Sequence, residues 1–479
     1  MNRTSLFYIL ILGVVGCAIA ALLQLGSTLP APVGTIERAA AQAPASESVF
    51  GAMASTIAHH FTDPLGRLFL QLLVIIAASR VMGRIFTSCG QPAVVGEMAA
   101  GILLGPSLFG LLAPETFSFM FPASSLGTLK LLSQIGVCLF MFAVGMELNV
   151  NHVRHKAHTA VVVSHASIVL PYLLGVILAY FLFSHLAAPG TSFTAFALFL
   201  GISMSITAFP VLARILQERG LSKTFLGNTA ITCAAVDDVT AWSILAFVVA
   251  ITRATSLGAS ALNLLLVLVF IALMLKVVKP GLVRVLGEAR LSEEHPSKGT
   301  LATVVCVVIG AALCTEVIGI HALFGAFLAG TIIPEINGFR HKLSLRVENF
   351  SSVLLLPLFF AFTGLRTQLG LLNDLQGRLI CLAILAVATI GKLGGSAITA
   401  RFTGMSWSDS LQLGALMNTR GLMELIALNI GYDLGVLSPR IFTMLVIMAL
   451  VTTALTGPLL TLFAAKAPRV ADDLMPARS

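Results

Sequence analysis

The stretch Asn228–Phe247, NTAITCAAVDDVTAWSILAF, places two adjacent carboxylates, Asp237 and Asp238, in the middle of an apolar segment. A segment of about 20 apolar residues is long enough to cross a bilayer as an α-helix. A charged side chain at the bilayer centre costs at least about 2.5–3.5 kcal/mol on insertion scales, so its presence there needs a reason. The stretch predicts a membrane-spanning helix with a functional acidic pair, and it disfavours a pair solvated at the membrane surface.

The composition of the whole chain agrees with this prediction. Hydrophobic residues make up 57% of the chain, charged residues make up 10%, and the mean hydropathy is +0.97. A soluble globular chain carries about 25% charged residues. Long apolar runs recur along the sequence, and the alternation typical of an outer-membrane barrel is missing. We therefore expect an all-α polytopic membrane protein.

The remaining composition excludes several classes of function. The net charge of +8 comes from Lys and Arg in loops, without basic runs interleaved with aromatic residues, so we expect no nucleic-acid partner. The seven cysteines are scattered, and none forms a CxxC or Cys/His cluster, so we predict neither a structural metal centre nor a cofactor. No nucleophile–base motif indicates an enzyme.

The chain divides into three parts. Residues 1–64 contain an apolar stretch at 5–26, which we interpret as a signal anchor in preference to a cleaved signal peptide, and then a linker rich in Ala, Pro and Ser. Residues 65–464 form the transmembrane domain, and 465–479 form a short cytoplasmic tail. The expected spans of the domain are 66–87, 93–112, 125–148, 158–184, 192–217, 223–251, 258–279, 299–319, 321–334, 349–366, 377–401, 408–432 and 439–464.

The loop charges orient these spans. Loops on the side of Met1 and of the C-terminus carry about 20 Lys or Arg residues, whereas the opposite loops carry about 7. Positively charged loops stay in the cytoplasm. We therefore expect a bacterial-type inner membrane location with a cytoplasmic C-terminus.

An internal repeat relates the two halves of the domain. GEMAAGILLGP (96–106) in the second span resembles GAFLAGTIIP (325–334) in the ninth. LFMFAVGMEL (139–148) in the third span resembles LFFAFTGLRT (358–367) in the tenth. Both offsets are seven spans, and an odd offset means that the halves are inverted in the membrane. The sequence thus predicts inverted repeats at about 65–251 and 299–464, an arrangement typical of secondary transporters.

Two spans have poor helical sequences at matched positions of this repeat. In the fifth, SMSITAFPVLARIL, Ser203, Ser205 and Thr207 precede Pro210, which cannot donate a backbone hydrogen bond. In the twelfth, GALMNTRGLMELIALNIG, the corresponding residues are Asn418, Thr419, Arg420 and Gly421. Interrupted helices at matched positions indicate a transport site, although a simple proline kink is the alternative for the fifth span.

Further charged residues lie inside the spans. Lys392 is central in LAILAVATIGKLGGSAITARF, where a buried ammonium needs an acidic partner unless it extends to the interface. Arg420 and Glu424 are four residues apart on one helix face, and we favour a structural pair over direct ion contact. Asp237 and Asp238 point about 100° apart and should titrate as a coupled unit. A cation that competes with protons for such a pair would be exchanged for them.

The motifs carry a family resemblance. QPAVVGEMAAGILLGPSLFG (91–110), SITAFPVLARIL (205–216), the Asp-Asp pair, GIHALFGAFLAGTIIP (319–334) and MNTRGLMELIALNIG (417–431) resemble the second branch of the monovalent cation:proton antiporter superfamily, which includes Kef-type and plant CHX-like exchangers. The resemblance implies a mobile core against a dimerisation scaffold, crossed discontinuous helices and a homodimer. It also implies that Asp238 and Thr207 bind the ion, and that Asp237 pairs with Lys392.

The sequence departs from this family at two points. Plant CHX-like members have a pair resembling Asn-Asp at the positions of Asp237 and Asp238. We therefore do not assign the number of protons exchanged per cation. Kef-type members carry a cytosolic nucleotide-binding domain that this sequence lacks. We expect exchange of Na⁺ or K⁺ for H⁺ by alternating access. A sodium-coupled solute symporter and a cation channel remain the alternatives.

Overall fold

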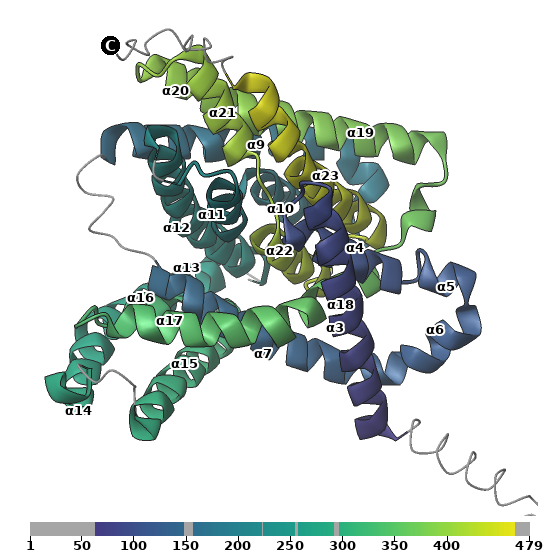
Figure 1. Cartoon of the computed structure of the whole chain (residues 1–479). Coiled ribbons are helices and arrows are strands. Elements are labelled where there is room, and N and C mark those ends of the chain that lie inside the picture. The colour runs from purple at the N-terminus through teal and green to yellow at the C-terminus, as the bar shows by residue number, and fades with distance from the viewer. Residues whose placement is uncertain (1–62, 148–156, 223, 254–256, 292–296, 465–479) are drawn as a thin grey trace, which may run out of the picture. The chain divides into compact units, whose positions relative to one another are not determined.

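The protein is described by a computed structural model that covers residues 63–147, 157–222, 224–253, 257–291 and 297–464. The expected signal anchor at 5–26, the linker and the tail at 465–479 lie outside the described residues. The described chain is helical apart from short turns and one isolated bridge between Ala187 and Leu437 (Figure 1). Its α-helices are α3 Pro64–Ser88, α4 Ala93–Leu104, α5 Phe109–Leu112, α6 Pro114–Met120, α7 Ala123–Glu147, α9 Ala157–Leu186, α10 Phe193–Ser205, α11 Phe209–Glu218, α12 Phe225–Arg253, α13 Leu257–Leu273, α14 Lys279–Leu291, α15 Lys298–Ile318, α16 Ala322–Thr331, α17 Phe339–Phe350, α18 Leu356–Arg366, α19 Leu375–Thr389, α20 Gly395–Phe402, α21 Trp407–Met417, α22 Leu422–Asp433 and α23 Pro439–Phe463.

The prediction of an all-α membrane protein is confirmed. Eleven helical segments of the described chain are long and apolar enough to span a membrane. Of the other two expected spans, one corresponds to the short apolar helix α16 and the other to the broken pair α21 and α22. The tenth span begins earlier than expected, because α17 continues through a π-helical turn at Ser351–Leu355 into α18. The count of thirteen spans stays a prediction.

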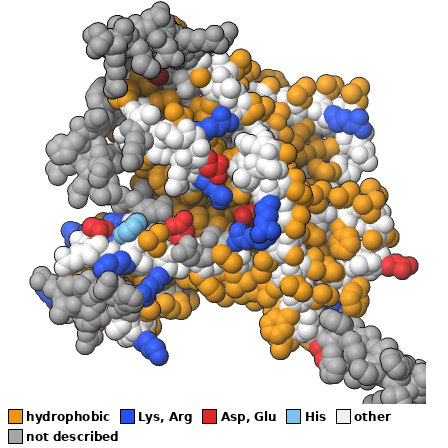
Figure 2. Space-filling view, in the orientation of Figure 1, with side chains coloured by type: hydrophobic (Ala, Val, Ile, Leu, Met, Phe, Trp, Pro, Cys, Tyr) orange, Lys and Arg blue, Asp and Glu red, His pale blue; other side chains and the backbone are white. Residues whose placement is uncertain are grey.

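The outer surface of the described chain is apolar. Large hydrophobic side chains such as Val317, Phe402 and Leu462 are each at least 74% exposed. In Figure 2, hydrophobic side chains cover much of the right-hand part of the visible face, whereas charged side chains lie mainly in its middle and at the lower left. This distribution is the reverse of that of a water-soluble protein, and it fits a surface in contact with lipid tails.

The helices pack into two groups. The first, which we call the site bundle, comprises α9–α12 and α19–α23: α9 packs against α10, α12 and α20, and α23 packs against α19, α21 and α22. The second, the flanking bundle, comprises α3–α7 and α13–α18: α7 packs against α16, α17 and α18, and α4 packs against α3 and α18. All the buried charged residues predicted inside spans for the site belong to the site bundle.

Glycine contacts in the flanking bundle follow the predicted repeat. Gly101 of α4 lies against the backbone of Phe360 in α18, and Gly330 of α16 lies against the backbone of Phe142 in α7. A Cβ at either glycine would overlap a backbone carbonyl, so only glycine permits these approaches. The repeat equates the second span with the ninth and the third with the tenth. If each half is replaced by its repeat, the contact between α4 and α18 therefore becomes the contact between α16 and α7.

Candidate functional site

The fifth span is interrupted before its proline. α10 ends at Ser205, the backbone is extended at Ile206 (φ −68°, ψ 134°), and α11 begins at Phe209. Pro210 lies in the first turn of α11, where its missing N–H would have no helical partner in any case. Pro210 therefore starts the second half-helix, and the proline-kink alternative does not describe this span.

The twelfth span is interrupted at the position that the repeat predicts. α21 ends at Met417 and α22 begins at Leu422, so Asn418–Gly421 lie outside both helices. Gly421 has φ 158° and ψ −133°, a conformation that residues with a Cβ rarely adopt. This glycine permits the chain to change direction and start α22 beside the first break.

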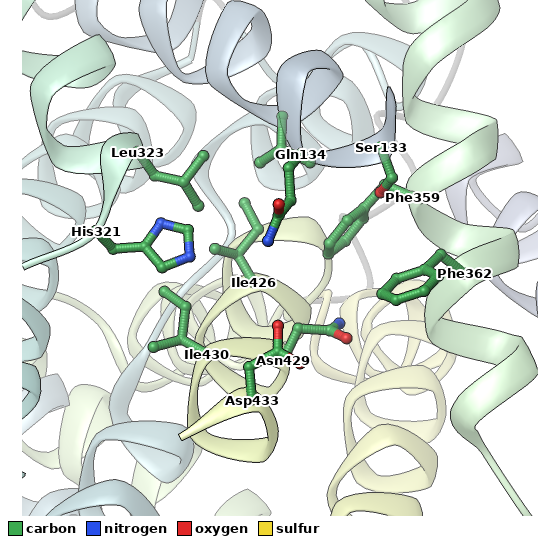
Figure 3. Close-up of a pocket in the computed structure, with 11 residues that line it drawn as sticks. Ser133, Gln134, His321, Leu323, Phe359, Phe362, Ile426, Asn429, Ile430 and Asp433 are labelled. Carbon is green, nitrogen blue, oxygen red and sulfur yellow. The ribbon is translucent and has the colours of Figure 1, made fainter. Parts of the chain in front are cut away.

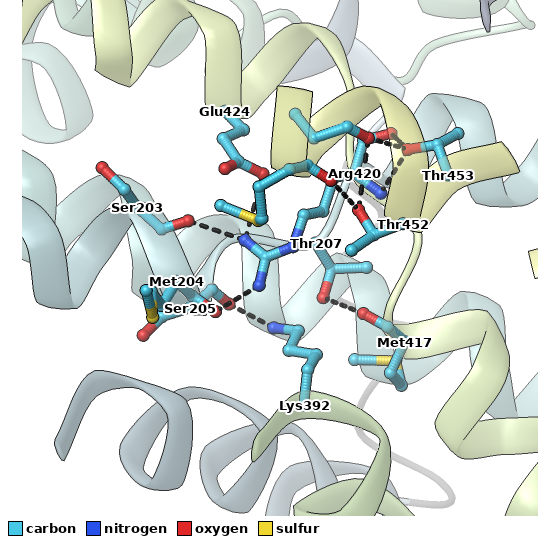
Figure 4. A network of polar contacts seen from close by, with 12 residues as sticks. Ser203, Met204, Ser205, Thr207, Lys392, Met417, Arg420, Glu424, Thr452 and Thr453 are labelled. Carbon is cyan, nitrogen blue, oxygen red and sulfur yellow. Dashed lines mark hydrogen bonds and ion pairs between the residues drawn. The ribbon is translucent and has the colours of Figure 1, made fainter. Parts of the chain in front are cut away.

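The two interruptions cross and bond to each other. The backbone N–H of Ala208 donates to the Thr419 carbonyl at 2.9 Å, and the Thr207 hydroxyl donates to the Met417 carbonyl at 3.0 Å (Figure 4). Backbone groups released by one break are thus satisfied by the other, which is necessary where no water is available. α23 supports the crossing, because Thr453 Oγ1 accepts from the Arg420 backbone N–H at 3.0 Å.

Asp237 lies next to the first interruption and is surrounded by donors. Its Oδ1 accepts from the Ser167 hydroxyl at 2.8 Å. Its Oδ2 accepts from the Thr207 backbone N–H at 3.0 Å and lies 3.1 Å from Lys392 Nζ. Asp237 and Lys392 are fully buried, so neither side chain reaches the membrane surface. Buried charges of this kind are retained when they are paired and hydrogen-bonded.

Lys392 connects the acidic helix to the broken helix. Its ammonium also donates to the carbonyl of Ser205, the last residue of α10 (Figure 4). It extends from a π-helical turn, Ile390–Gly394, between α19 and α20. Such turns are rare and occur frequently at functional sites. The turn therefore places the only lysine of the span beside both the break and Asp237.

Asp238 belongs to a different face of α12. It is 1% exposed, so the pair is not solvated at the membrane surface. Adjacent helical residues point about 100° apart, so Asp238 does not share the direction that Asp237 takes toward Lys392. Lys392 thus pairs with Asp237, on a different face of α12 from Asp238.

Arg420 holds the end of α10 from the second interruption. Its Nη1 donates to the Ser203 carbonyl at 2.6 Å, and its Nη2 donates to the Met204 carbonyl at 2.7 Å. Nη1 is also 3.0 Å from Glu424 Oε2, so the expected pair is present. Carbonyls of the last turn lack helical partners, and a cation is favoured there. Arg420 therefore fixes the crossing, and Glu424 balances its charge.

The other predicted residues have structural contacts or none. The Ser205 hydroxyl donates to the carbonyls of Ile168 and Gly201, at 3.0 and 2.8 Å. The Thr419 hydroxyl lies 3.3 Å from that of Thr456. Asn418 is fully buried, and its side-chain amide has no hydrogen-bond partner among the described residues. An unsatisfied buried amide beside two helix breaks indicates a place where water or an ion is held.

Residues that the sequence did not identify complete the arrangement. Ser167 of α9 bonds Asp237, and Thr453 of α23 bonds the backbone of Arg420 on both sides. Small hydroxyl residues in apolar spans were the available signal, namely Ser164 and Ser167 in the fourth span and Thr452, Thr453 and Thr456 in the thirteenth. That signal is weak, because a hydroxyl in a membrane helix is commonly satisfied by its own backbone.

The arrangement has the parts that a cation and a proton would need in order to compete. It combines two buried carboxylates, a buried ammonium, helix ends freed by two interruptions and an unsatisfied amide. Oxygen atoms are the ligands that hard cations prefer. No group of three or more His, Cys, Asp or Glu side chains in the described residues could hold a transition metal. The oxygen donors of the site suit a hard cation.

Known proteins resemble this chain over most of its length. Residues 72–466 match the family model described as "Sodium/hydrogen exchanger, transmembrane". The Na(+)/H(+) antiporter NhaS4 of Synechocystis sp. is 44% identical over 399 residues, which cover 83% of this chain and 97% of that protein. Cation/H(+) antiporter 17 of Arabidopsis thaliana is 37% identical over 82% of this chain, and the K(+)/H(+) antiporter 1 of Saccharomyces cerevisiae is 30% identical over 86%. Each of these two matches covers 48% of the longer relative.

One solved structure supports the fold. The sodium proton antiporter MjNhaP1 from Methanocaldococcus jannaschii, determined at pH 8, superposes with a TM-score of 0.58 at 14% sequence identity. The match covers 82% of this chain and 96% of that one. At this identity the likeness concerns the fold alone.

Proposed function

Since this chain belongs to the sodium/hydrogen exchanger family of membrane transporters, we propose that it exchanges a monovalent cation, Na⁺ or K⁺, for protons across its membrane. It is an integral membrane protein, and its family consists of transporters, not enzymes. The observation that carries the proposal is the crossing of two broken helices beside a buried Asp-Asp pair, one member of which is neutralised by a lysine.

Asp238 is the residue that we assign to the transported ions. It is buried, and it follows Asp237, which contacts the first interruption through the Thr207 backbone N–H. A carboxylate in this position binds either a proton or a cation, and each displaces the other. Thr207 is placed at the first interruption, where its backbone already touches Asp237. We assign it to the site as a neutral oxygen ligand.

Asp237 and Lys392 hold the site in shape and adjust its charge. When Asp237 is ionised, Lys392 neutralises it, and the pair also fixes the end of α10 through the Ser205 carbonyl. Loss of a proton from Lys392 would leave Asp237 able to compete for the cation. The pair thus provides a second protonation event per cycle, which would determine whether net charge moves.

Alternating access requires the site bundle to move against the flanking bundle. In transporters built from inverted repeats, one bundle rocks against the other around a fixed site. All the proposed site residues lie in the site bundle, so they can move together without breaking the crossing. We further propose a homodimer in a bacterial-type inner membrane. The Cys89 turn and the C-terminus would face the cytoplasm, in accordance with the Lys and Arg bias of the loops.

Transport by purified protein in proteoliposomes tests this proposal. Vesicles containing a pH-sensitive dye are preloaded with protons, and Na⁺, K⁺, Li⁺ or choline is added outside. We expect Na⁺ or K⁺ to drive proton release, choline to drive none, and a collapsed membrane potential to leave exchange running. Cation currents without proton counterflow would contradict exchange and support a channel.

A further inference from the structure

The site bundle and the flanking bundle are joined by charged residues at one end of α22. Asp433, the last residue of α22, accepts from Arg366 Nη2 at 2.6 Å and lies 3.1 Å from Lys130 Nζ. Arg366 ends α18 and Lys130 is in α7, so both cations belong to the flanking bundle. One carboxylate of the site bundle is therefore held by two cations of the other bundle.

Neighbouring side chains reinforce this junction. Arg366 Nη1 also donates to Asn429 Oδ1 at 2.9 Å, and Asn429 Nδ2 donates to the Thr363 hydroxyl at 2.8 Å. The guanidinium lies 4.2 Å from the ring centre of Phe362 and 5.0 Å from that of Tyr432, so it contacts an aromatic ring of each bundle. The Arg366 side chain is only 16% exposed, which limits screening by water and salt.

A cavity lies directly behind the junction. It measures about 30 Å³, which is room for about one water molecule. α7 contributes Ser133 and Gln134 to its wall, and α22 contributes Asn429 and Asp433 (Figure 3). The bundles are thus separated by a space here, and the polar contacts of Asn429 and Asp433 bridge them at its rim.

A surface hollow lies at the opposite end of the flanking bundle. α4 begins just after the Cys89–Gln91 turn. Gly105, which follows the other end of α4, lies against Gly364 near the end of α18, so the turn and the end of α18 are at opposite ends of α4. A hollow of about 680 Å³ lies at the turn and is lined from both bundles, by Cys89, Gly90 and Gln91 on one side and by Arg219, Pro458 and Thr461 on the other. At this end the ion pairs Arg80–Glu97 and Arg214–Glu218 lie within single bundles, and Arg214 also attracts Glu97 from the other bundle.

We propose that Asp433, with Arg366 and Lys130, is a latch that holds the bundles together at the Asp433 end while the Cys89 end is open. The inference rests on the proposed function, because it gives the latch its role in alternating access. α22 begins at the crossing and ends at Asp433, so motion of the site bundle must separate Asp433 from Arg366. Asp433 is a positioning residue: it sets the populations of the two states and does not touch the ion.

Half-saturation measured from each side tests the latch. In Asp433→Asn the state open at the Asp433 end should gain population. The cation concentration for half-maximal exchange should then fall by about threefold to tenfold when the cation is offered at that end, and rise by about twofold or less at the Cys89 end. Right-side-out and everted vesicles present the two sides of the protein to the added cation. Labelling of the exposed Cys89 by an impermeant maleimide shows in which vesicles the Cys89 end faces outward.

Two variants serve as controls. Asp433→Glu keeps the charge and should restore the wild-type values. Asp374→Asn removes a carboxylate that bonds Arg440 at 2.5 Å within the site bundle, so it should not alter the ratio between the sides. A fall in maximal rate that is equal from both sides, with unchanged half-saturation, would overturn the latch. The wild-type protein, measured in parallel, distinguishes the two proposals. If the wild type does not exchange cations for protons, the proposed function is contradicted. If the wild type exchanges normally and Asp433→Asn has the same half-saturation from both sides as the wild type, only the latch is contradicted.

A cross-link provides the second measurement if Asp433→Asn fails to fold. In a background without other reactive cysteines, Arg366→Cys and Asp433→Cys are joined by a reducible bifunctional thiol reagent. We expect exchange to stop on cross-linking and to return on reduction. Exchange that continues while the two positions are joined would overturn the proposal.

Discussion

The ammonium of Lys392 lies 3.1 Å from Oδ2 of Asp237, and both side chains are completely buried. This pair joins α12 to the π-helical turn after α19, and through the Ser205 carbonyl it also joins the end of α10. Three helices of the site bundle are thus connected at one ammonium group. We therefore expect the pair to contribute to the stability of the site.

Removal of Lys392 alone should destabilise the protein strongly. Lys392→Met leaves a buried carboxylate without its counter-ion, and breaking a buried pair in this way costs about 3–5 kcal/mol. The double variant Lys392→Met with Asp237→Asn removes both charges and should recover much of the loss. Thermal unfolding of the detergent-solubilised variants measures both effects. A single variant that melts like the wild type would contradict the pairing.

Replacement of Arg420 by lysine should not be conservative. Arg420 donates to two carbonyls and a carboxylate at once, whereas an ammonium lacks the planar fork that reaches them together. Arg420→Lys should lower the melting temperature and slow exchange, and Arg420→Ala should do so more, since Glu424 loses its partner. Arg219→Lys, at an exposed contact to Thr461, is the matched control and should have little effect.

The glycine contact between α16 and α7 should tolerate no side chain. Gly330→Ala places a Cβ against the Phe142 backbone, and overpacking of this kind costs about 1–3 kcal/mol. Gly310→Ala in α15 meets no atom within 4 Å and should be neutral or stabilising. The difference in melting temperature between the two alanine variants measures the contact. Equal melting temperatures would place the helices farther apart than described.

Asp374 should contribute stability that depends on pH in a defined direction. The Gly377 backbone N–H, followed by the Arg440 guanidinium, holds the pKa of Asp374 below its ordinary value. A carboxyl whose pKa is lowered on folding stabilises the protein above its unfolded pKa of about 3.9 and loses that effect as pH falls through the folded value. The difference in melting temperature between the wild type and Asp374→Ala should be constant from about pH 5 to 8. A difference that instead grows below pH 4 would contradict the assignment.

The fold class could be predicted from the sequence, and so could the buried charged residues that the structure brings together in the site bundle. Asp237, Asp238, Lys392 and Arg420 stood out because a charge inside an apolar span needs compensation. The matched interruptions at Thr207 and Thr419 followed from the repeat, and the structure joins them through bonds at 2.9 and 3.0 Å. Patterns of hydropathy and charge are local properties, so they can be read without coordinates.

Contacts between distant helices could not be predicted in the same way. The bond from Ser167 to Asp237 spans 70 residues, and serine is common in membrane helices without such a role. The Arg366–Asp433 pair joins residues at the ends of two spans, where charged side chains are expected in any case. Only the packing of the helices against one another distinguishes these residues from others of their type.

The most direct test of the central claim is exchange by Asp238→Asn in proteoliposomes containing a pH dye. The substitution keeps the size of the side chain and removes the charge that we assign to the cation and the proton. Asp238→Glu and Asp409→Asn, which alters a half-buried carboxylate in the first turn of α21, serve as controls. We predict that Asp238→Asn loses cation-driven proton release while it folds and reconstitutes like the wild type. Full exchange by that variant would contradict the account.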